Sequence, residues 1–557
     1  MRRWSVPLGI RVTAVGLLAF AAGCNPTDGP KTGSQTNWLT ACDSDADCGD
    51  LQCWCGTCTR SCDDAAGCTE LPDAACVPAE DVRAVALCAG NCPTTPGLCL
   101  LPCPSEGCGT GMSCVAGVCS PTPEPTASVS VDDTERFQAL VGFGAGIAYV
   151  LDDIVQHPRK AAIFDTVFSE SGLTVLRLRN RYGQTDADLG STSEIVTAAR
   201  ERLEVVPTIV LNSASPPGSL KANGSNWCEG NPDTCTLATL ADGTFDYAGL
   251  ASHWRASLDE YALAGIEPDF ISIQNNPDWV PETGDSNEAC RFLPTEGSAT
   301  ATTDSGDIEV EYPGYAQALE AVLGQLAGLA SVPGIIAPET TGYLDVADYL
   351  AALDVNSVDA IAHHLYQTNL DNLDLPALAE LGALGEQQQR PVFLSEMYAD
   401  PLTTAVLLHA ALAVEGAAMY VHNGFVAPAS LPEPDPASLV SLTDDDFVIG
   451  DVYHVLRHYS GHIAPEWLRV AAESDTEELL TSAWASPAND ALVVVLTNPG
   501  TTERAVQIDL GQVDPGATEV TRTTLGGIER SAAIGTLPSA GIVTVPGESM
   551  VTVATQR

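Results

Sequence analysis

The chain has 557 residues, of which 45% are hydrophobic and 17% charged, and its formal net charge at pH 7 is −49. This length exceeds one ordinary domain and allows a large buried core, so we expect two or three domains. The negative charge argues against binding of nucleic acid or anionic lipid headgroups through bulk electrostatics, because both would be repelled. A solvated acidic surface explains the charge most simply.

The first 24 residues have the features of a bacterial export signal. Arginines precede an apolar run, and residues 21–24 read Ala-Ala-Gly-Cys. The run is too short for a convincing membrane span, and the Gly-Cys junction is similar to a lipoprotein cleavage site. We therefore expect a signal peptide over 1–23 and a lipid on Cys24, with ordinary signal cleavage nearby as the alternative. The protein would be anchored at the outer membrane or cell surface by this lipid, or secreted.

Residues 24–120 form a cysteine-rich segment without apolar periodicity, in which fifteen cysteines follow Cys24. Such a segment must be held together by cross-links. Cys55-x-x-Cys58 is compatible with zinc, but the preceding export signal and the absence of histidine favour disulfides. The last four cysteines roughly repeat the earlier spacing, which suggests two small modules.

Fifteen is an odd number, so one of these cysteines is expected to pair outside the segment. Cys290 is the candidate partner if Cys228 and Cys235 pair with each other. The connectivity within the segment stays open.

Residues 121–126 read Pro-Thr-Pro-Glu-Pro-Thr and form a stiff linker at the clearest domain boundary. Beyond the linker, apolar runs alternate with helical patterns. Their apolar residues are continuous, which is typical of strands buried on both faces. Eight such runs predict a closed (β/α)8 TIM barrel over 127–462. The runs are 140–146, 174–178, 206–211, 270–274, 334–337, 358–362, 392–395 and 417–421.

From residue 463 the pattern changes to short strand-like runs separated by Gly, Pro and Asn. This pattern predicts a β-sandwich over 463–557, to which residues 127–139 contribute a strand. The expected fold class is therefore α/β, a (β/α)8 barrel with a side β-sandwich, preceded by a small disulfide-rich segment.

One strand-like run delivers polar residues at its carboxyl end. It reads Asp269-Phe-Ile-Ser-Ile-Gln-Asn-Asn-Pro and follows a helical pattern over 246–264, which Asp246 can cap and Gly265 can end. Catalytic groups of (β/α)8 barrels lie at the carboxyl ends of the strands. The expected site is therefore at Asn275 and Asn276.

This run resembles the S-I-Q-N-E-P strand of glycoside hydrolase family 30, the glucosylceramidase, glucanase and xylanase family. The resemblance covers residues 127–557, because several further motifs follow in the family's order. These motifs are Gly142-Phe-Gly, Leu176-Arg-Leu-Arg, Asn212-Ser-Ala-Ser-Pro-Pro-Gly, Ala337-Pro-Glu, Ala362-His-His-Leu-Tyr and Phe393-Leu-Ser-Glu.

The resemblance implies that Glu396 is the nucleophile of a retaining mechanism, which needs two carboxyl groups about 5 to 5.5 Å apart. A structural pairing of Glu396 with Arg177 or His364 is the alternative reading. The resemblance also implies that Asn275 hydrogen-bonds a sugar hydroxyl, unless its amide serves the backbone. The full set of expected substrate-binding residues is Arg177, Asn275, His364, Tyr366 and His422.

Three positions depart from the family pattern. Asn276 replaces the general acid/base Glu, Ala214 replaces a Trp, and Val421-His422 stands where an aromatic pair is usual. An amide cannot protonate a leaving oxygen, and the loss of acid/base help typically lowers rates by about 10² to 10⁴.

Asp278, Glu282 and Glu339 are candidate substitute carboxylates, although each is also explained as surface or scaffold. A metal site built from His363, His364, His422 and Glu396 is not expected, because their spacing matches no zinc signature.

The sequence therefore predicts an exported hydrolase-like protein that acts on β-linked glycans of the xylan or β-glucan type, with attenuated activity and no cofactor. Its expected partners are a polysaccharide or oligosaccharide and, through the N-terminal lipid only, a membrane; nucleic acid is not expected. The alternative is a catalytically inactive carbohydrate-binding lipoprotein. In a third hypothesis, the cysteine-rich segment serves adhesion and the barrel is its platform.

Overall fold

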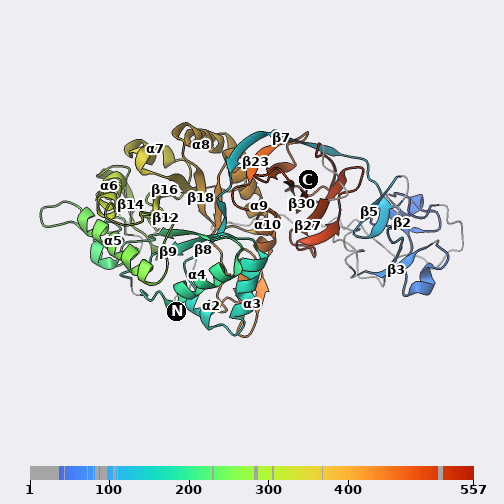
Figure 1. The fold of residues 1–557 in the computed structure, drawn as a ribbon, viewed down its shortest axis with the longest axis horizontal. Helices are drawn as coiled ribbons and strands as arrows, with labels where there is room; N and C mark the ends of the chain where they lie inside the picture. Colours follow the sequence, from blue (N-terminus) through green and yellow to red (C-terminus); the bar gives the residue numbers. More distant parts are fainter. Residues whose placement is uncertain are drawn as a thin grey trace.

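The structure is a computed structural model of the whole chain. It describes residues 37–556 apart from 43, 72, 80, 82–83, 85–86, 88–96, 105–107, 109–110, 185, 229–230, 282–286, 304–305, 367 and 512–517. The described residues form three parts in a row (Figure 1). The barrel and the cysteine-rich segment lie at opposite ends, with a large sheet between them.

Eight parallel strands close into the predicted barrel. Each expected apolar run coincides with one of them to within three residues, so the (β/α)8 prediction is confirmed. In spatial order the strands are β8 (Gly142–Ile147), β9 (Val175–Arg179), β10 (Thr208–Asn212), β12 (Phe270–Ser272), β16 (Gly334–Thr340), β17 (Ala360–His364), β18 (Val392–Met397) and β19 (Met419–His422).

Helices follow every barrel strand and cover the outside of the ring. They are α2 (Leu151–Gln156) and α3 (Lys160–Phe164) with the π-helical turn Asp165–Glu170, α4 (Gly190–Arg202), α5 (Tyr247–Leu263), α6 (Tyr315–Leu326), α7 (Val346–Ala352), α8 (Leu375–Gln388), α9 (Pro401–His409) with the π-helical turn Ala410–Glu415, and α10 (Asp451–Ser460). Within the described residues, every helix is too short or too polar to span a bilayer.

The helix before the expected site begins and ends as the sequence predicts. The Asp246 side chain accepts a hydrogen bond from Gly249 N at 2.7 Å, which satisfies one of the open amides of the first turn of α5. Gly265 follows the helix with a φ of 76°, a left-handed conformation that glycine adopts without steric cost.

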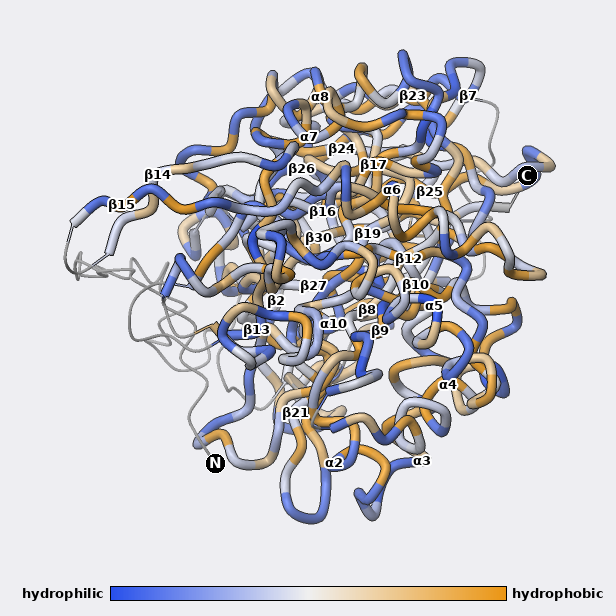
Figure 2. The backbone as a smooth tube through the Cα atoms, turned by 90° about the vertical axis from the view of Figure 1, so that its left-hand side faces the viewer, coloured by the Kyte–Doolittle hydropathy of each residue, from blue (hydrophilic) through white to orange (hydrophobic). Residues whose placement is uncertain are grey.

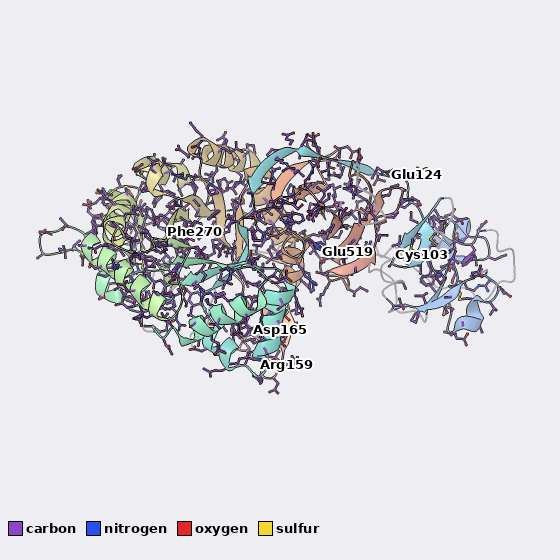
Figure 3. The ribbon with its side chains drawn as sticks, in the orientation of Figure 1. Cys103, Glu124, Arg159, Asp165, Phe270 and Glu519 are labelled. Carbon is purple, nitrogen blue, oxygen red and sulfur yellow. A yellow bond between two sulfur atoms is a disulfide. The ribbon has the colours of Figure 1, made fainter. Side chains whose placement is uncertain are left out.

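Two apolar cores hold the barrel. Nine buried residues, among them Val210 and Phe393, fill the inside of the ring, and a larger cluster lies between the strands and the helices. Phe270 packs edge-on against Phe393 with ring centres 5.5 Å apart, in the middle of the barrel (Figure 3). The polar residues at the carboxyl ends of the strands therefore rest on a packed floor.

The side sandwich is a nine-stranded sheet whose two halves share one core. Its first strand comes from before the barrel: β7 (Ala127–Ala139) pairs antiparallel with β23 and parallel with β26. Orange and blue segments alternate along the tube in Figure 2, and the loop beneath β21 (Val440–Leu442), at the edge of the molecule, is blue and hydrophilic. The other strands are β23 (Leu468–Ser474), β24 (Leu480–Ala485), β25 (Ala491–Asn498), β26 (Arg504–Asp509), β27 (Thr518–Thr524), β28 (Ala532–Gly535), β29 (Ile542–Val545) and β30 (Ser549–Gln556).

The described cysteine-rich segment contains three repeats of one disulfide pattern, not the two modules that the spacing suggested. In each repeat four cysteines form two interleaved bonds, the first of the four with the third and the second with the last, and the last two of the four lie side by side on a hairpin. The pairs are Cys42–Cys53 and Cys48–Cys58, Cys62–Cys76 and Cys68–Cys99, and Cys103–Cys114 and Cys108–Cys119. The hairpins are β1 (Gln52–Trp54) with β2 (Thr57–Thr59), β3 (Ala75–Pro78) with β4 (Gly97–Leu100), and β5 (Met112–Val115) with β6 (Val118–Pro121).

Cys228 and Cys235 pair with each other, as predicted. The expected bond from Cys290 to the cysteine-rich segment is wrong, because Cys290 is a free thiol that is completely buried in the barrel's outer core. Burial raises its pKa to about 12. Cys24 lies outside the described residues.

Candidate active site at the barrel mouth

Arg177 is the centre of a buried network at the carboxyl ends of the barrel strands. It lies on β9, and its guanidinium donates to Glu339 Oε1 from Nε at 3.1 Å and from Nη2 at 3.0 Å. Nη1 donates to Glu396 Oε2 at 2.6 Å, and Nη2 donates to Asn275 Oδ1 at 2.6 Å. One cation thus joins the ends of β12, β16 and β18.

Glu396 presents its carboxylate at the mouth, on β18, and is only 7% exposed. Besides Arg177 it has two further donors: Tyr366 Oη donates to Oε1 at 2.8 Å, and Asn423 Nδ2 donates to the same oxygen at 3.0 Å. Both oxygens are therefore fixed in direction. The sequence-predicted pairing of Glu396 with Arg177 exists, and it leaves the carboxylate at the edge of the site.

Gly146 on β8 makes room for Asn423. A Cβ at Gly146 would lie 2.2 Å from Asn423 Oδ1 and 3.2 Å from Asn423 Cα. Position 146 therefore needs a glycine, because the Asn423 amide approaches the strand too closely for a side chain. Asn423 was missed by the sequence analysis, although it follows His422 directly at the end of β19.

Glu339 is fully buried and carries a negative charge that Arg177 neutralises. Burial raises the pKa of its carboxyl, but Arg177 and then His364 outweigh this effect and hold the pKa at about 2. A carboxyl group that stays ionised at neutral pH cannot donate a proton. Glu339 is thus scaffold in this geometry.

Asn276 lies opposite, at the end of β12, with a left-handed φ of 47° that asparagine tolerates better than most residues. Its backbone N–H donates to Glu339 O at 3.0 Å. The side-chain Oδ1 lies 2.8 Å from His364 Nδ1, and an amide oxygen only accepts, so His364 carries a proton on Nδ1. His364 Nε2 faces Glu339 Oε1 at 3.8 Å.

The other expected residues lie away from the centre or outside it. Asp278 accepts from Thr341 N at 2.9 Å and Oγ1 at 3.1 Å, and burial raises its pKa. His422 is completely buried, with Nε2 donating to Ala437 O at 2.7 Å, and burial lowers its pKa to about 4. Glu282 lies outside the described residues.

A second ionic network, which the sequence analysis missed, adjoins the first. Arg179, two residues beyond Arg177 on the same face of β9, donates from Nε and Nη2 to the two oxygens of Glu288, at 2.5 Å each. Its Nη1 donates to Asp186 at 2.9 Å. Glu288 also accepts from Tyr149 Oη at 3.2 Å. The alternation in Leu176-Arg-Leu-Arg predicts the shared face of the arginines, whereas Glu288 sits in a loop strand, β13 (Asn287–Glu288), that no periodicity marks.

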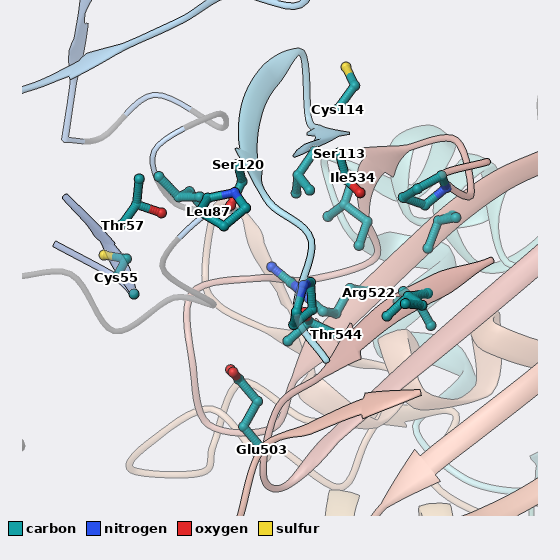
Figure 4. A pocket seen from close by; sticks show the side chains of 18 of the residues that line it. Cys55, Thr57, Leu87, Ser113, Cys114, Ser120, Glu503, Arg522, Ile534 and Thr544 are labelled. Atoms are coloured by element: carbon teal, nitrogen blue, oxygen red, sulfur yellow. The ribbon is translucent and has the colours of Figure 1, made fainter. Parts of the chain in front are cut away.

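A cleft of about 360 Å³ lies elsewhere, between the cysteine-rich segment and the side sandwich (Figure 4). Its walls are mixed, with apolar Leu87 on one side and Ile534 on the other, and with the polar and charged side chains of Ser113, Glu503 and Arg522 among them. None of the predicted site residues lines it. Figure 3 places Glu124 of the linker between the same two parts.

The mouth of the (β/α)8 barrel thus holds the Glu396 carboxylate together with the amides of Asn275, Asn276 and Asn423 at the strand ends. No family model and no curated protein matches the chain. Solved structures do match it, and they define the class of fold. At 19% identity and a TM-score of 0.57, 77% of the chain covers all of a subfamily 8 xylanase of glycoside hydrolase family 30 from Clostridium acetobutylicum.

Two further structures give the same result. The catalytic domain of a family 30 xylanase from Talaromyces cellulolyticus has a TM-score of 0.58 at 18% identity, and a conserved exported protein from Bacteroides fragilis has a TM-score of 0.60 at 14% identity. In each case 77% of this chain covers 100% of the other. The chain therefore has the fold of glycoside hydrolase family 30, as the sequence motifs predicted.

Proposed function

We propose that the barrel mouth binds β-linked glycans and that Glu396 attacks the anomeric carbon as the nucleophile of a retaining mechanism. The observation that carries this proposal is the Glu396 carboxylate, which lies at the edge of the mouth with both oxygens oriented by Arg177, Tyr366 and Asn423. A nucleophile needs a fixed direction of attack, and these three donors supply it.

The proton-transfer half of the reaction is weak in this proposal. By the family resemblance Asn276 occupies the acid/base position, and its amide has no proton to give at neutral pH. Glu339 is ionised and buried, and Asp278 is held by Thr341. Among the described residues, no other carboxyl group contacts Glu396 or its donors. Formation of the glycosyl-enzyme would then depend on how readily the leaving group departs without protonation.

The glycan class follows from structures of similar fold. Xylanases are among them, and so is an endo-β1,6-glucanase with a TM-score of 0.56 at 12% identity. We therefore infer a xylan-type or β-glucan-type polysaccharide or oligosaccharide as the ligand. Export is part of the proposal, because disulfides such as those of the N-terminal segment persist in oxidising compartments. A lipid on Cys24 would anchor the protein.

Covalent trapping tests the proposal directly. The protein is incubated with 2,4-dinitrophenyl 2-deoxy-2-fluoro-β-xyloside and with the corresponding glucoside, which need little acid help to lose dinitrophenolate. We expect the intact mass to rise by one fluoroglycosyl group, located on Glu396 by peptide mapping. Glu396→Gln should gain no mass. Labelling of another residue, or equal labelling of Glu396→Gln, would overturn the assignment of the nucleophile.

A catalytically silent glycan-binding protein is the second candidate. It is favoured by Glu339, which in the described part of the chain is the only other carboxylate paired with Arg177, because its low pKa suits charge balance and not proton transfer. This candidate predicts measurable binding of xylan or β-glucan together with no label and no hydrolysis of any aryl glycoside. Labelling of Glu396 would exclude it.

A further inference from the structure

Tyr149 is an aromatic residue at the barrel mouth that the proposed nucleophile does not explain. It follows the carboxyl end of β8, and 36% of its surface is exposed. Its hydroxyl donates to Glu288 Oε2 at 3.2 Å, and the Arg179 guanidinium lies 5.3 Å from the centre of its ring. The ring is thus fixed at one end and supported by a cation, while part of its surface meets solvent.

The partner of the Tyr149 hydroxyl is itself immobile. The Glu288 side chain is 1% exposed. It accepts two hydrogen bonds from Arg179 and a third from Asn226 Nδ2. A fork of this kind fixes both the distance and the plane of a carboxylate. Tyr149 is therefore held in one orientation before any ligand arrives, which lowers the entropy lost on binding.

Tyr149 and Tyr366 are brought to the mouth from opposite sides of Glu396. In the closed barrel the order β17, β18, β19, β8 places the Glu396 strand between the strands that lead to Tyr366 and Tyr149. Tyr366 is also 36% exposed, although its hydroxyl reaches Glu396. Burial of the Tyr149 hydroxyl raises its pKa, and the negative charges of Glu288 and Glu396 add to this effect. Two partly exposed rings therefore flank the nucleophile.

The charged side chains around these rings are paired with one another, but carboxylates outnumber guanidinium groups by four to three. Three guanidinium groups, those of Arg177, Arg179 and Arg181, each lie within 3.4 Å of a carboxylate oxygen. Four carboxylates face them, so negative charge is in excess. The four are Glu339, Glu396, Glu288 and Asp186. An anionic sugar would meet repulsion at such a mouth, whereas an uncharged ring would not.

We propose that Tyr149 forms the stacking wall of a subsite beside Glu396 for an uncharged sugar ring, and that the Arg179–Glu288 pair positions it. This inference rests on the proposed function, whose ligand it narrows to neutral β-glycans. One face of a pyranose exposes C–H groups, which an aromatic ring removes from water, and aromatic side chains with a few fixed polar groups are typical linings of ligand sites. The ring also supplies aromatic surface that Ala214 and His422 lack.

Binding of xylohexaose and of a β1,6-linked glucohexaose, measured by calorimetry with Glu396→Gln as the background, tests the subsite. We expect Tyr149→Ala to weaken the Kd of the better ligand by roughly 10- to 100-fold. Tyr149→Phe and Tyr149→Trp keep a ring and should stay within about fivefold of the background protein. The Kd of the Glu288→Gln protein should lie between those of Tyr149→Phe and Tyr149→Ala, because this substitution loosens the Tyr149 ring without removing it.

Phe137 offers a matched control. It is an equally exposed aromatic side chain, also 36%, with the Arg469 guanidinium 3.6 Å from its ring centre, but it lies on β7 of the side sheet. Phe137→Ala should leave the Kd unchanged. Unchanged binding by a folded Tyr149→Ala protein, or equal losses with Phe, Trp and Ala at position 149, would overturn the proposal.

The charge of the ligand is tested with one polymer in two forms, glucuronoxylan before and after chemical reduction of its carboxyl groups. The reduced form should bind more tightly, by a factor that shrinks when salt rises from 20 to 500 mM, since screening weakens the repulsion. Tighter binding of the acidic form would overturn the inference while leaving the proposed function intact. Absence of binding to every glycan, with no label on Glu396, would overturn both.

Discussion

The two sides of the barrel mouth each hold a carboxylate that Arg177 contacts, but they differ in what the carboxylate can do. On the β18 side, Glu396 keeps 7% of its surface exposed at the edge of the mouth while it accepts a hydrogen bond from Arg177. On the β16 side, Glu339 is completely buried, and Arg177 neutralises its negative charge. Two acidic residues on one arginine therefore do not make an acid/base pair.

The exposure and the pKa of a carboxyl group, not the number of carboxylates, decide whether it can donate a proton to a ligand at a glycosidase-like barrel mouth. A retaining mechanism needs one carboxyl group that stays ionised and one that exchanges protons near neutral pH. The burial of Glu339 next to a cation excludes the second role. By the family resemblance, Asn276 at the end of β12 is the position at which, under the proposed function, a proton donor would be restored.

The largest expected effect is therefore a gain. Asn276→Glu should raise hydrolysis of xylan or β-glucan by about 10² to 10⁴, the usual range for general acid/base help. A carboxylate oxygen at position 276 can accept a hydrogen bond from His364 Nδ1, as Asn276 Oδ1 does now. Reducing-sugar release from the polymer measures the gain.

Asn276→Gln is the matched control, because it has the length of glutamate and no acidic proton. Both variants pay the same left-handed backbone conformation, which costs a non-glycine residue about 1 kcal/mol, so their melting temperatures should fall together. Equal activity of the Glu and Gln variants would mean that position 276 is not the acid/base position.

The second prediction removes the cation that both sides share. Arg177→Met leaves Glu339 buried without its partner, and breaking a buried pair in this way typically costs about 3 to 5 kcal/mol. Denaturant unfolding followed by tryptophan fluorescence measures the loss. Arg255→Met removes an exposed helical pair with Asp259 and should cost at most about 0.5 kcal/mol. Equal losses of unfolding free energy in the two variants would show that the buried Arg177–Glu339 pair contributes no more stability than an exposed pair.

The third prediction uses pH to separate the two sides. The pKa of Glu339 is about 2 in the folded protein against 4.5 for the free side chain, so its ionised form stabilises the fold. That stability is complete above about pH 4.5 and is lost as pH falls toward 2, by an amount on the order of 3 kcal/mol.

Chemical unfolding at steps between pH 6 and 2.5 measures this dependence. The difference between wild type and Glu339→Gln isolates the Glu339 contribution, because other acidic groups, including Asp278 with its raised pKa, titrate in both proteins. The wild-type curve should be the steeper of the two. Parallel curves would mean that Glu339 titrates in the folded protein as it does in the unfolded chain.

Much of this architecture is predictable from sequence because continuous apolar runs leave little choice. The run expected over 392–395 is the core of β18, and the Phe393-Leu-Ser-Glu motif brings Glu396 to its end. The disulfide repeats were harder to find. In the middle repeat, 22 residues separate the two hairpin cysteines, Cys76 and Cys99, and this long insertion hides the common spacing.

The second network at the mouth was beyond the reach of sequence patterns. Glu288 reaches Arg179 from a two-residue strand paired with β11 (Trp227–Cys228), and such a short element has no period to detect. Tyr149 lies in a loop where an exposed aromatic residue carries no local signature. Only the closed ring, which brings β8, β9 and the loop after β12 to one rim, shows that these residues belong together.

The fourth prediction concerns the hydrogen bond from Asn423 to Glu396 and leaves the carboxylate itself unchanged. Gly146→Ala would place a methyl group 2.2 Å from Asn423 Oδ1, so the amide must move and its 3.0 Å hydrogen bond to Glu396 is lost. A hydrogen bond to a charged group contributes about 1.5 to 3 kcal/mol, and the fluoroglycoside should therefore label Glu396 roughly tenfold or more slowly. Asn423→Ala should reproduce this loss.

Gly324→Ala is the matched control, because Gly324 lies on α6 and no atom lies within 4 Å of the new Cβ. Glu396 in this variant should be labelled at the wild-type rate, and the fold should be stabilised by about 0.4 to 1 kcal/mol. A wild-type labelling rate in Gly146→Ala would show that the direction of the Glu396 carboxylate is set by Arg177 and Tyr366 alone.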